Sequence, residues 1–136
     1  MNVFPNTVTE SLSENLIRQA CQLSPEERAE LFIQYVQKAQ QVWLLQGDAG
    51  FVMVEHGDSV CLPVWPHQDL AKAWSLSSQQ PARQISVELS TFVQTWLPGL
   101  MANQTELLIF PAGPATDALA LDGDEVTKAL SGEGED

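Results

Sequence analysis

Hydrophobic positions in residues 11–40 recur with a helical period of three to four residues. Ser11-Leu-Ser-Glu14 is typical of a capping box at the start of a first helix. Ser24-Pro-Glu-Glu27 starts a second helix, because Pro25 would then stand at the first helical position, where its missing N–H costs nothing. The pattern predicts two helices that meet at Leu23–Ser24, the second running to about Gln40.

The pattern then changes to short apolar runs, which are typical of strands. Runs at 42–45, 51–54 and 60–64 are separated by Gln46-Gly-Asp-Ala-Gly50 and Glu55-His-Gly-Asp-Ser59. Gly and Asp in these separators favour hairpin turns. The three runs therefore predict an antiparallel meander.

The rest of the chain alternates between the two patterns. We expect helices after Pro66, over 89–97 and from Asp122 to about Leu130, with Pro98-Gly99 ending the middle one. Strands are expected at 84–87, 106–110 and 118–121, and the four tryptophans fall within apolar patterns that predict burial. The fold class is therefore α+β: an antiparallel sheet, made of the meander and the C-terminal strands, packed with N-terminal and amphipathic helices. We expect a single domain over residues 1–130 and a flexible acidic tail over 131–136.

Charge narrows the range of partners. Six Lys and Arg stand against 18 Asp and Glu, a net charge of −12, and residues 112–136 alone hold one basic and seven acidic groups, a net −6. Such a field repels nucleic acid and anionic membranes and attracts metal ions or a basic protein surface. No signal peptide or membrane-length apolar run is visible, so we expect a monomeric cytoplasmic protein. The alternative that acidity serves only solubility stays open.

The sequence offers no paired catalytic groups. His56 and His67 belong to no zinc-binding spacing, and no nucleophile elbow or phosphate-binding glycine loop is present. Cys61 stands in an apolar strand, where burial raises a thiol pKa, and Cys21 is likewise expected to be a small buried side chain. We therefore expect that the protein is not an enzyme.

Carboxylates in predicted loops are the candidate metal ligands, because Ca²⁺ takes about six to eight oxygens from flexible segments. Asp48 lies in the first turn of the meander, and Glu55 and Asp58 lie in the second. These turns fall at opposite ends of the predicted sheet. Asp48 and Asp58 therefore should not share one ion, whereas Glu55 could join Asp58.

A denser group near the C-terminus consists of Asp117, Asp122, Asp124 and Glu125. Asp122 and Asp124 have the spacing that opens an EF-hand, but Thr127 occupies the position that requires glycine, so the segment is not an EF-hand. An Asp at the N-cap with Glu three residues later is also a usual helix start. Cation binding and helix capping both remain open for this group.

Three strings carry a resemblance to known families: Trp43-Leu-Leu-Gln46, Leu62-Pro-Val-Trp-Pro66 and Trp96-Leu-Pro-Gly99. Over roughly residues 25–115 the chain resembles a family of small bacterial proteins of unknown function. In size, acidity and these strings it is also similar to the acidic calcium-binding proteins of filamentous cyanobacteria (the CcbP family). That similarity implies cytosolic, non-EF-hand calcium signalling tied to heterocyst differentiation. The strings are packing and turn residues, so the resemblance assigns no ligands.

Two hypotheses follow for the function. The first is reversible Ca²⁺ binding by the loop carboxylates, with the protein acting as an intracellular buffer or sensor. The alternative is a non-catalytic acidic interaction module, an adaptor or immunity-like protein that binds a basic protein surface.

Overall fold

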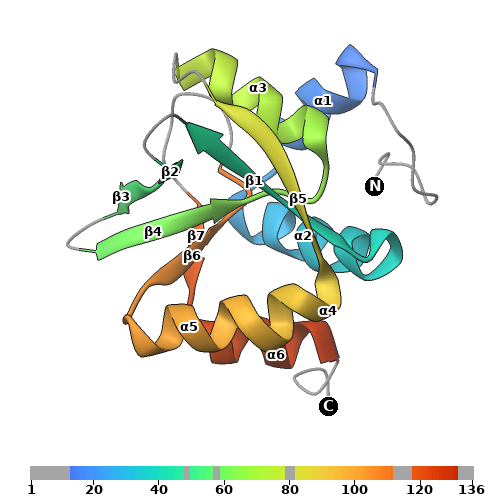
Figure 1. The fold of residues 1–136 in the computed structure, drawn as a ribbon. Helices are drawn as coiled ribbons and strands as arrows, with labels where there is room; N and C mark the ends of the chain where they lie inside the picture. Colours follow the sequence, from blue (N-terminus) through green and yellow to red (C-terminus); the bar gives the residue numbers. More distant parts are fainter. Residues whose placement is uncertain (1–12, 48–49, 57–58, 79–81, 112–117, 132–136) are drawn as a thin grey trace.

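The computed structural model describes residues 13–47, 50–56, 59–78, 82–111 and 118–131, and it has the expected α+β fold (Figure 1). In chain order the elements are α1 (Glu14–Cys21), α2 (Pro25–Ala39), β1 (Gln41–Gly47), β2 (Gly50–Phe51), β3 (Val54–His56), β4 (Ser59–Val64), α3 (Gln68–Ser78), β5 (Arg83–Glu88), α4 (Leu89–Thr91), η1 (Phe92–Trp96), α5 (Leu97–Ala102), β6 (Glu106–Ile109), β7 (Leu119–Leu121) and α6 (Gly123–Ser131). Figure 1 shows α1 and α3 at one end of the molecule, α5 and α6 at the other, and the strands between them.

The two N-terminal helices begin at serine caps. The predicted helix start at Ser24-Pro25 is confirmed, and it includes a capping box that was not predicted: Ser24 Oγ accepts from the N–H of Glu27 (3.2 Å), and Glu27 Oε1 accepts from the N–H of Ser24 (3.1 Å). The start of the first helix differs from the prediction. Its N-cap is Ser13, whose side chain accepts from the N–H of Leu16, and Glu14 is already inside the helix. Ser11 lies outside the described residues.

The strands form two small sheets, so the predicted continuous meander is wrong. One sheet has the order β2-β1-β5 and the other the order β3-β4-β6-β7. The run 51–54 breaks after Phe51, because β2 pairs with β1 whereas β3 pairs with β4. The sheets meet at Trp43 and Trp65, which exchange two backbone hydrogen bonds of 2.9 Å.

Strand β4 has a parallel neighbour, which the sequence pattern did not predict. It pairs antiparallel with β3 and parallel with β6. Parallel strands need a long crossover connection, and here the chain between β4 and β6 supplies α3, β5 and the helical segment 89–102. Strand β5, which pairs with β1 in the first sheet, lies within this crossover.

The segment 89–102 continues through the predicted stop at Pro98-Gly99. The N–H of Leu97 donates to the carbonyl of Phe92, five residues earlier, which makes η1 a π-helical turn. The extra residue in this turn lets a new helix begin at Leu97, with Pro98 in the first turn, where its lack of an N–H is harmless. No helix within the described ranges is long and apolar enough to cross a membrane.

A single main core lies between the sheets and helices. Its largest fully buried side chains include Trp65, Phe32 and Phe92. Trp74 is buried as predicted, but Trp43 and Trp96 are only partly buried and pack against the outside of the core. The expectation of burial therefore holds for two of the four tryptophans.

Candidate functional site

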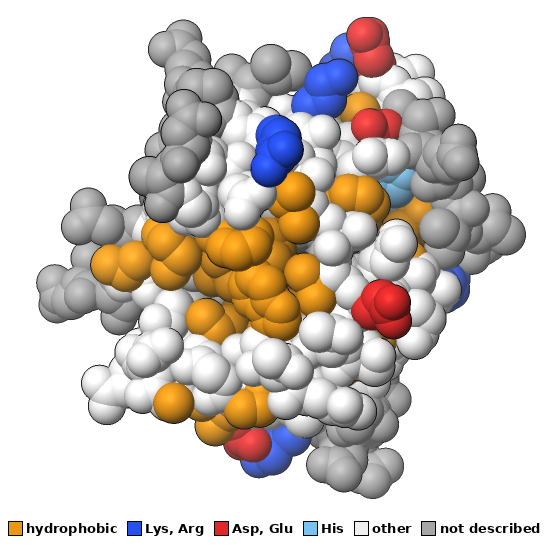
Figure 2. Space-filling model, viewed as in Figure 1, with side chains coloured by type: hydrophobic (Ala, Val, Ile, Leu, Met, Phe, Trp, Pro, Cys, Tyr) orange, Lys and Arg blue, Asp and Glu red, His pale blue; other side chains and the backbone are white. Residues whose placement is uncertain are grey.

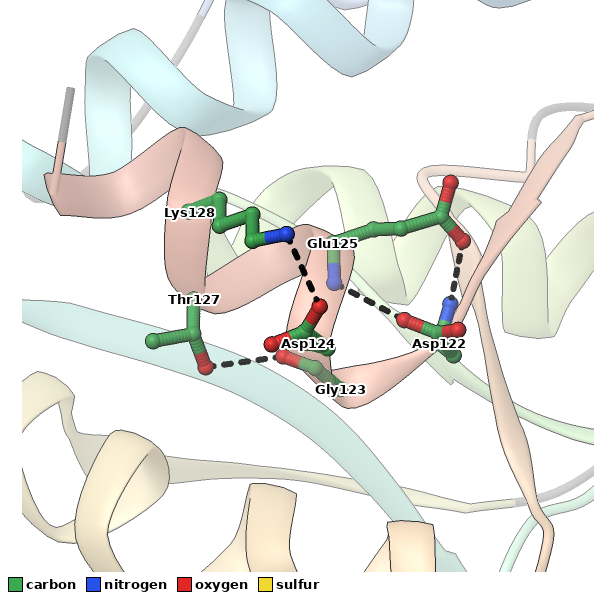
Figure 3. A network of polar contacts seen from close by, with 6 residues as sticks. All are labelled: Asp122, Gly123, Asp124, Glu125, Thr127 and Lys128. Atoms are coloured by element: carbon green, nitrogen blue, oxygen red, sulfur yellow. Dashed lines mark hydrogen bonds and ion pairs between the residues drawn. The ribbon is translucent and has the colours of Figure 1, made fainter. Parts of the chain in front are cut away.

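The acidic group at the start of α6 is organised by reciprocal hydrogen bonds (Figure 3). Asp122 Oδ1 accepts from the N–H of Glu125 (2.8 Å), and Glu125 Oε1 accepts from the N–H of Asp122 (3.1 Å). Two backbone donors that a helix start leaves unpaired are satisfied in this way. The helix-capping interpretation of these two residues is confirmed.

Asp124 makes a different contact on the same turn. Its carboxylate lies 3.2 Å from Lys128 Nζ, one helical turn later, and both side chains are more than half exposed. Figure 3 shows Asp124 on the other side of the turn from the Asp122–Glu125 pair. The three carboxylates therefore do not converge on one point, although each keeps an oxygen that can still meet solvent or an ion.

The other predicted ligands are spread along the chain. Asp48, Asp58 and Asp117 lie outside the described residues. Glu55 lies in β3, where its backbone is opposite Val60 of β4. In the part of the chain that the structure describes, no three His, Cys, Asp or Glu side chains are grouped so that they could hold a metal ion. Whether the predicted ligands bind a metal ion stays a prediction.

His67 and Cys61 have structural roles. His67 is buried, and its Nδ1 accepts from the N–H of Asp69 (3.0 Å) at the start of α3, while its ring meets that of Tyr35 edge-on. Cys61 is fully buried beside Leu108. Burial, and secondarily the charge of Glu106, raises the pKa of the Cys61 thiol, so the reactive thiolate is disfavoured.

A buried arginine, which the sequence patterns did not reveal, holds the end of β6. Arg28 Nη1 donates to the carbonyl of Phe110 (2.9 Å), and its Nε donates to that of Leu23 (3.1 Å). Trp65 Nε1 donates to the carbonyl of Pro111 (3.0 Å). Phe110 has a positive φ of 50°, an unusual conformation for an aromatic residue. These bonds therefore hold a sharp turn where the chain leaves the second sheet.

An apolar area occupies the middle of the face seen in Figure 2, between β5 and α5. Phe51 and Trp96, both partly exposed, form an aromatic pair, edge-to-face with centroids 5.0 Å apart, and Trp96 also stacks on Phe92. Ile85 belongs to the same side of the sheet as Phe51, because the register pairs Gln46 with Phe51 and Leu44 with Ile85. We call Phe51, Ile85, Val87 and Trp96, all partly exposed, the apolar surface.

Sequence reasoning missed this surface because it depends on three separate elements. The relevant signal is weak: the alternation of Ile85 and Val87 predicted a strand but not its neighbour. Trp96 looks like a core residue from its helical spacing, and only the position of β2 shows that it stands at the margin of the core.

No curated protein and no solved structure matches the chain. A family model does match, over residues 29–130, which is most of the chain and includes every element from α2 to α6 except the first turn of α2 and the last residue of α6. The description of that family assigns no activity. The chain belongs to the family described as protein of unknown function (DUF2750).

Proposed function

We propose that this chain is a non-catalytic interaction module that binds a basic segment of a partner protein. The observation that carries the proposal is the apolar surface, where Phe51, Ile85 and Trp96 are partly exposed. Figure 2 shows a contiguous apolar area on this face of the molecule. Contiguous exposed apolar areas are typical of sites where proteins bind one another.

Charge supports a basic partner. The net charge of −12 attracts and steers cationic molecules over distances of about 8 Å at physiological salt. Glu88 is exposed at the end of β5, beside Val87 of the apolar surface. A segment that combines Lys or Arg with apolar residues would complement both features.

The environments of His67 and Cys61 support a non-catalytic role. His67 Nδ1 is engaged in capping α3, and the burial of Cys61 raises its thiol pKa. Neither residue is arranged as an activated base or nucleophile.

Binding of model peptides tests the proposal. A fluorescent peptide in which lysine alternates with valine should bind at low salt and more tightly than one in which lysine alternates with serine. Ile85→Thr keeps a β-branched residue but removes apolar contact, so it should weaken binding about fivefold, equivalent to roughly 1 kcal/mol. Met101→Thr is the matched control, because Met101 is an exposed apolar residue that lies beside Gly123 of α6.

Two results would count against the proposal. If neither cationic peptide binds at low salt, the proposal of an interaction module is wrong. Equal affinity for both peptides, together with an Ile85→Thr variant that binds like wild type, would show that charge alone acts and that the apolar surface is not the site.

Reversible calcium binding is the second candidate, and the concentrated charge of residues 112–136 favours it. Exposed oxygens of Asp124 and its neighbours could contribute to an ion site together with carboxylates beyond the described ranges. Such a protein would act as a calcium buffer or sensor. A calcium titration followed by amide chemical shifts tests this, because the shifts report both binding and its location.

A further inference from the structure

Strand β5 is the last strand of its sheet, and its two edges differ. One edge pairs with β1 along its whole length, from Arg83 opposite Gln46 to Glu88 opposite Gln41. The other edge has no neighbouring strand among the described elements, since the order of the sheet is β2-β1-β5. In Figure 1, β5 crosses the front of the molecule from α3 to α4.

Three hydrogen bonds show which backbone groups of β5 point outward. The N–H of Leu89 donates to the carbonyl of Gln40, so these two residues form a hydrogen-bonded pair. In an antiparallel ladder such pairs recur at every second position, and Val42 and Val87 therefore also exchange backbone hydrogen bonds. The N–H and C=O of Trp43 are both hydrogen-bonded to the backbone of Trp65, on the side away from β5. Ser86, opposite Trp43, therefore directs its own N–H and C=O outward, and Gln84 does the same.

These outward groups are unpaired within the described part of the chain. No backbone hydrogen bond between described elements reaches Gln84 or Ser86 from outside the β1–β5 pair. Ser86 is exposed and Gln84 is partly exposed. An edge with free donors and acceptors is a template for an additional strand.

The side chains of β5 define what such a strand should contain. Ile85 and Val87 are partly exposed and lie on the face of Phe51, whereas Ser86 and the exposed Glu88 lie on the opposite face. An added strand would place every second side chain beside Ile85 and Val87 and the intervening ones beside Ser86 and Glu88. Apolar residues suit the first set and Lys or Arg suits the second.

We infer that the outer edge of β5 binds an extended segment of a partner protein, with alternating apolar and basic residues, as an additional strand of the sheet. This inference rests on the proposed function and specifies how the partner is held. Charge selects a basic partner over a second copy of this chain, because two copies that each carry a net charge of −12 would repel one another. Backbone hydrogen bonds would supply the affinity, and the alternation of side chains the selectivity.

Ser86→Pro is the decisive variant. It removes the outward N–H and fills the edge with a ring, but leaves the β1–β5 hydrogen bonds in place, and proline is tolerated on strand edges in this orientation. Ser86→Thr is the matched control because it keeps the N–H. We expect Ser86→Pro to bind the alternating lysine–valine peptide at least about tenfold more weakly than wild type, and Ser86→Thr to bind it like wild type.

Two further measurements keep the test independent of how well the proline variant folds. The same peptide with its central backbone amide nitrogens methylated keeps its charge and its side chains. It should nevertheless lose binding to the wild-type protein, because its backbone N–H donors are gone. Amide hydrogen exchange should slow at Gln84 and Ser86 when the unmethylated peptide is bound.

The outcomes separate the two proposals. If Ser86→Pro and the methylated peptide bind normally while Ile85→Thr still weakens binding, strand addition is wrong and the interaction module stands. Unchanged exchange at Gln84 and Ser86 in the complex leads to the same conclusion. If the free protein sediments as a dimer that Ser86→Pro dissociates, the edge belongs to a second copy and the inference is wrong. If no cationic peptide binds at low salt, both proposals fail.

Discussion

Gly123, the first residue of α6, lies directly against Met101 of α5. A Cβ at position 123 would be 2.7 Å from Met101 Cγ and 3.0 Å from the carbonyl oxygen of Leu97. Gly123→Ala should therefore push the two helices apart and lower the free energy of unfolding by about 1–3 kcal/mol. Chemical denaturation measures the change.

Gly99 provides the control for this packing. It lies in α5, and nothing lies within 4 Å of a Cβ built there. Gly99→Ala should raise stability by about 0.5–1 kcal/mol, because alanine loses less backbone entropy in a helix. Equal effects of the two substitutions would show that the α5–α6 contact is not tight.

The capping role of Asp122 can be separated from a role in metal binding. Asp122→Ala removes the acceptor for the N–H of Glu125 and should lower stability by about 1 kcal/mol. Asp122→Asn keeps an acceptor oxygen and should be close to wild type. If both variants also weaken calcium binding to a similar extent, Asp122 is a ligand in addition to a cap.

Calcium binding predicts a gain in stability by mass action. Calcium at about a hundredfold excess over its dissociation constant should add about 2.7 kcal/mol to the free energy of unfolding. Equal magnesium should add less, because Mg²⁺ requires octahedral geometry and gives up water reluctantly. Melting curves that coincide in calcium, magnesium and chelator would reject calcium binding and leave the interaction module as the remaining candidate.

Glu27 should make the stability of α2 dependent on pH. Hydrogen bonds from the backbone and then the hydroxyl of Ser24 hold the pKa of the Glu27 carboxyl below its ordinary value of 4.5. A lowered folded-state pKa stabilises the protein above the ordinary value, and this contribution is lost as pH falls through the folded-state pKa. Glu27→Gln keeps an acceptor but does not titrate, so its thermal midpoint should approach that of wild type as the pH falls below the ordinary value of 4.5 and through the lowered folded-state pKa. A constant difference between the two proteins across this range would contradict the role of the charge.

Cys61 should affect stability and not an activity. Cys61→Ala leaves a small cavity beside Leu108 and should cost on the order of 1 kcal/mol. Because burial raises its pKa, the native thiol should react with iodoacetamide much more slowly than the unfolded one. Rapid modification of the folded protein at neutral pH would show that Cys61 is accessible.

Short-range features were predictable from the residues alone. Ser24 with Glu27, and Asp122 with Glu125, satisfy backbone donors three residues away, and such contacts depend on almost nothing beyond the local chain. Pro98 is the exception among the local signals. Its effect as a helix stop was overcome by the π-turn at Phe92–Trp96, which the packing of the segment against the core supports.

Pairing between strands was decided by the tertiary structure. Alternation shows that Arg83–Glu88 suits a strand, but its pairing with β1 depends on contacts between residues some 40 positions apart. The same holds for the parallel pair β4–β6 and for the division of the predicted meander at Phe51. The residues themselves thus determined where helices start, which segments extend and how acidic the chain is. Only the assembled sheets determined that the outer edge of β5 has no neighbouring strand among the described elements, because this depends on which distant segments the chain brings together.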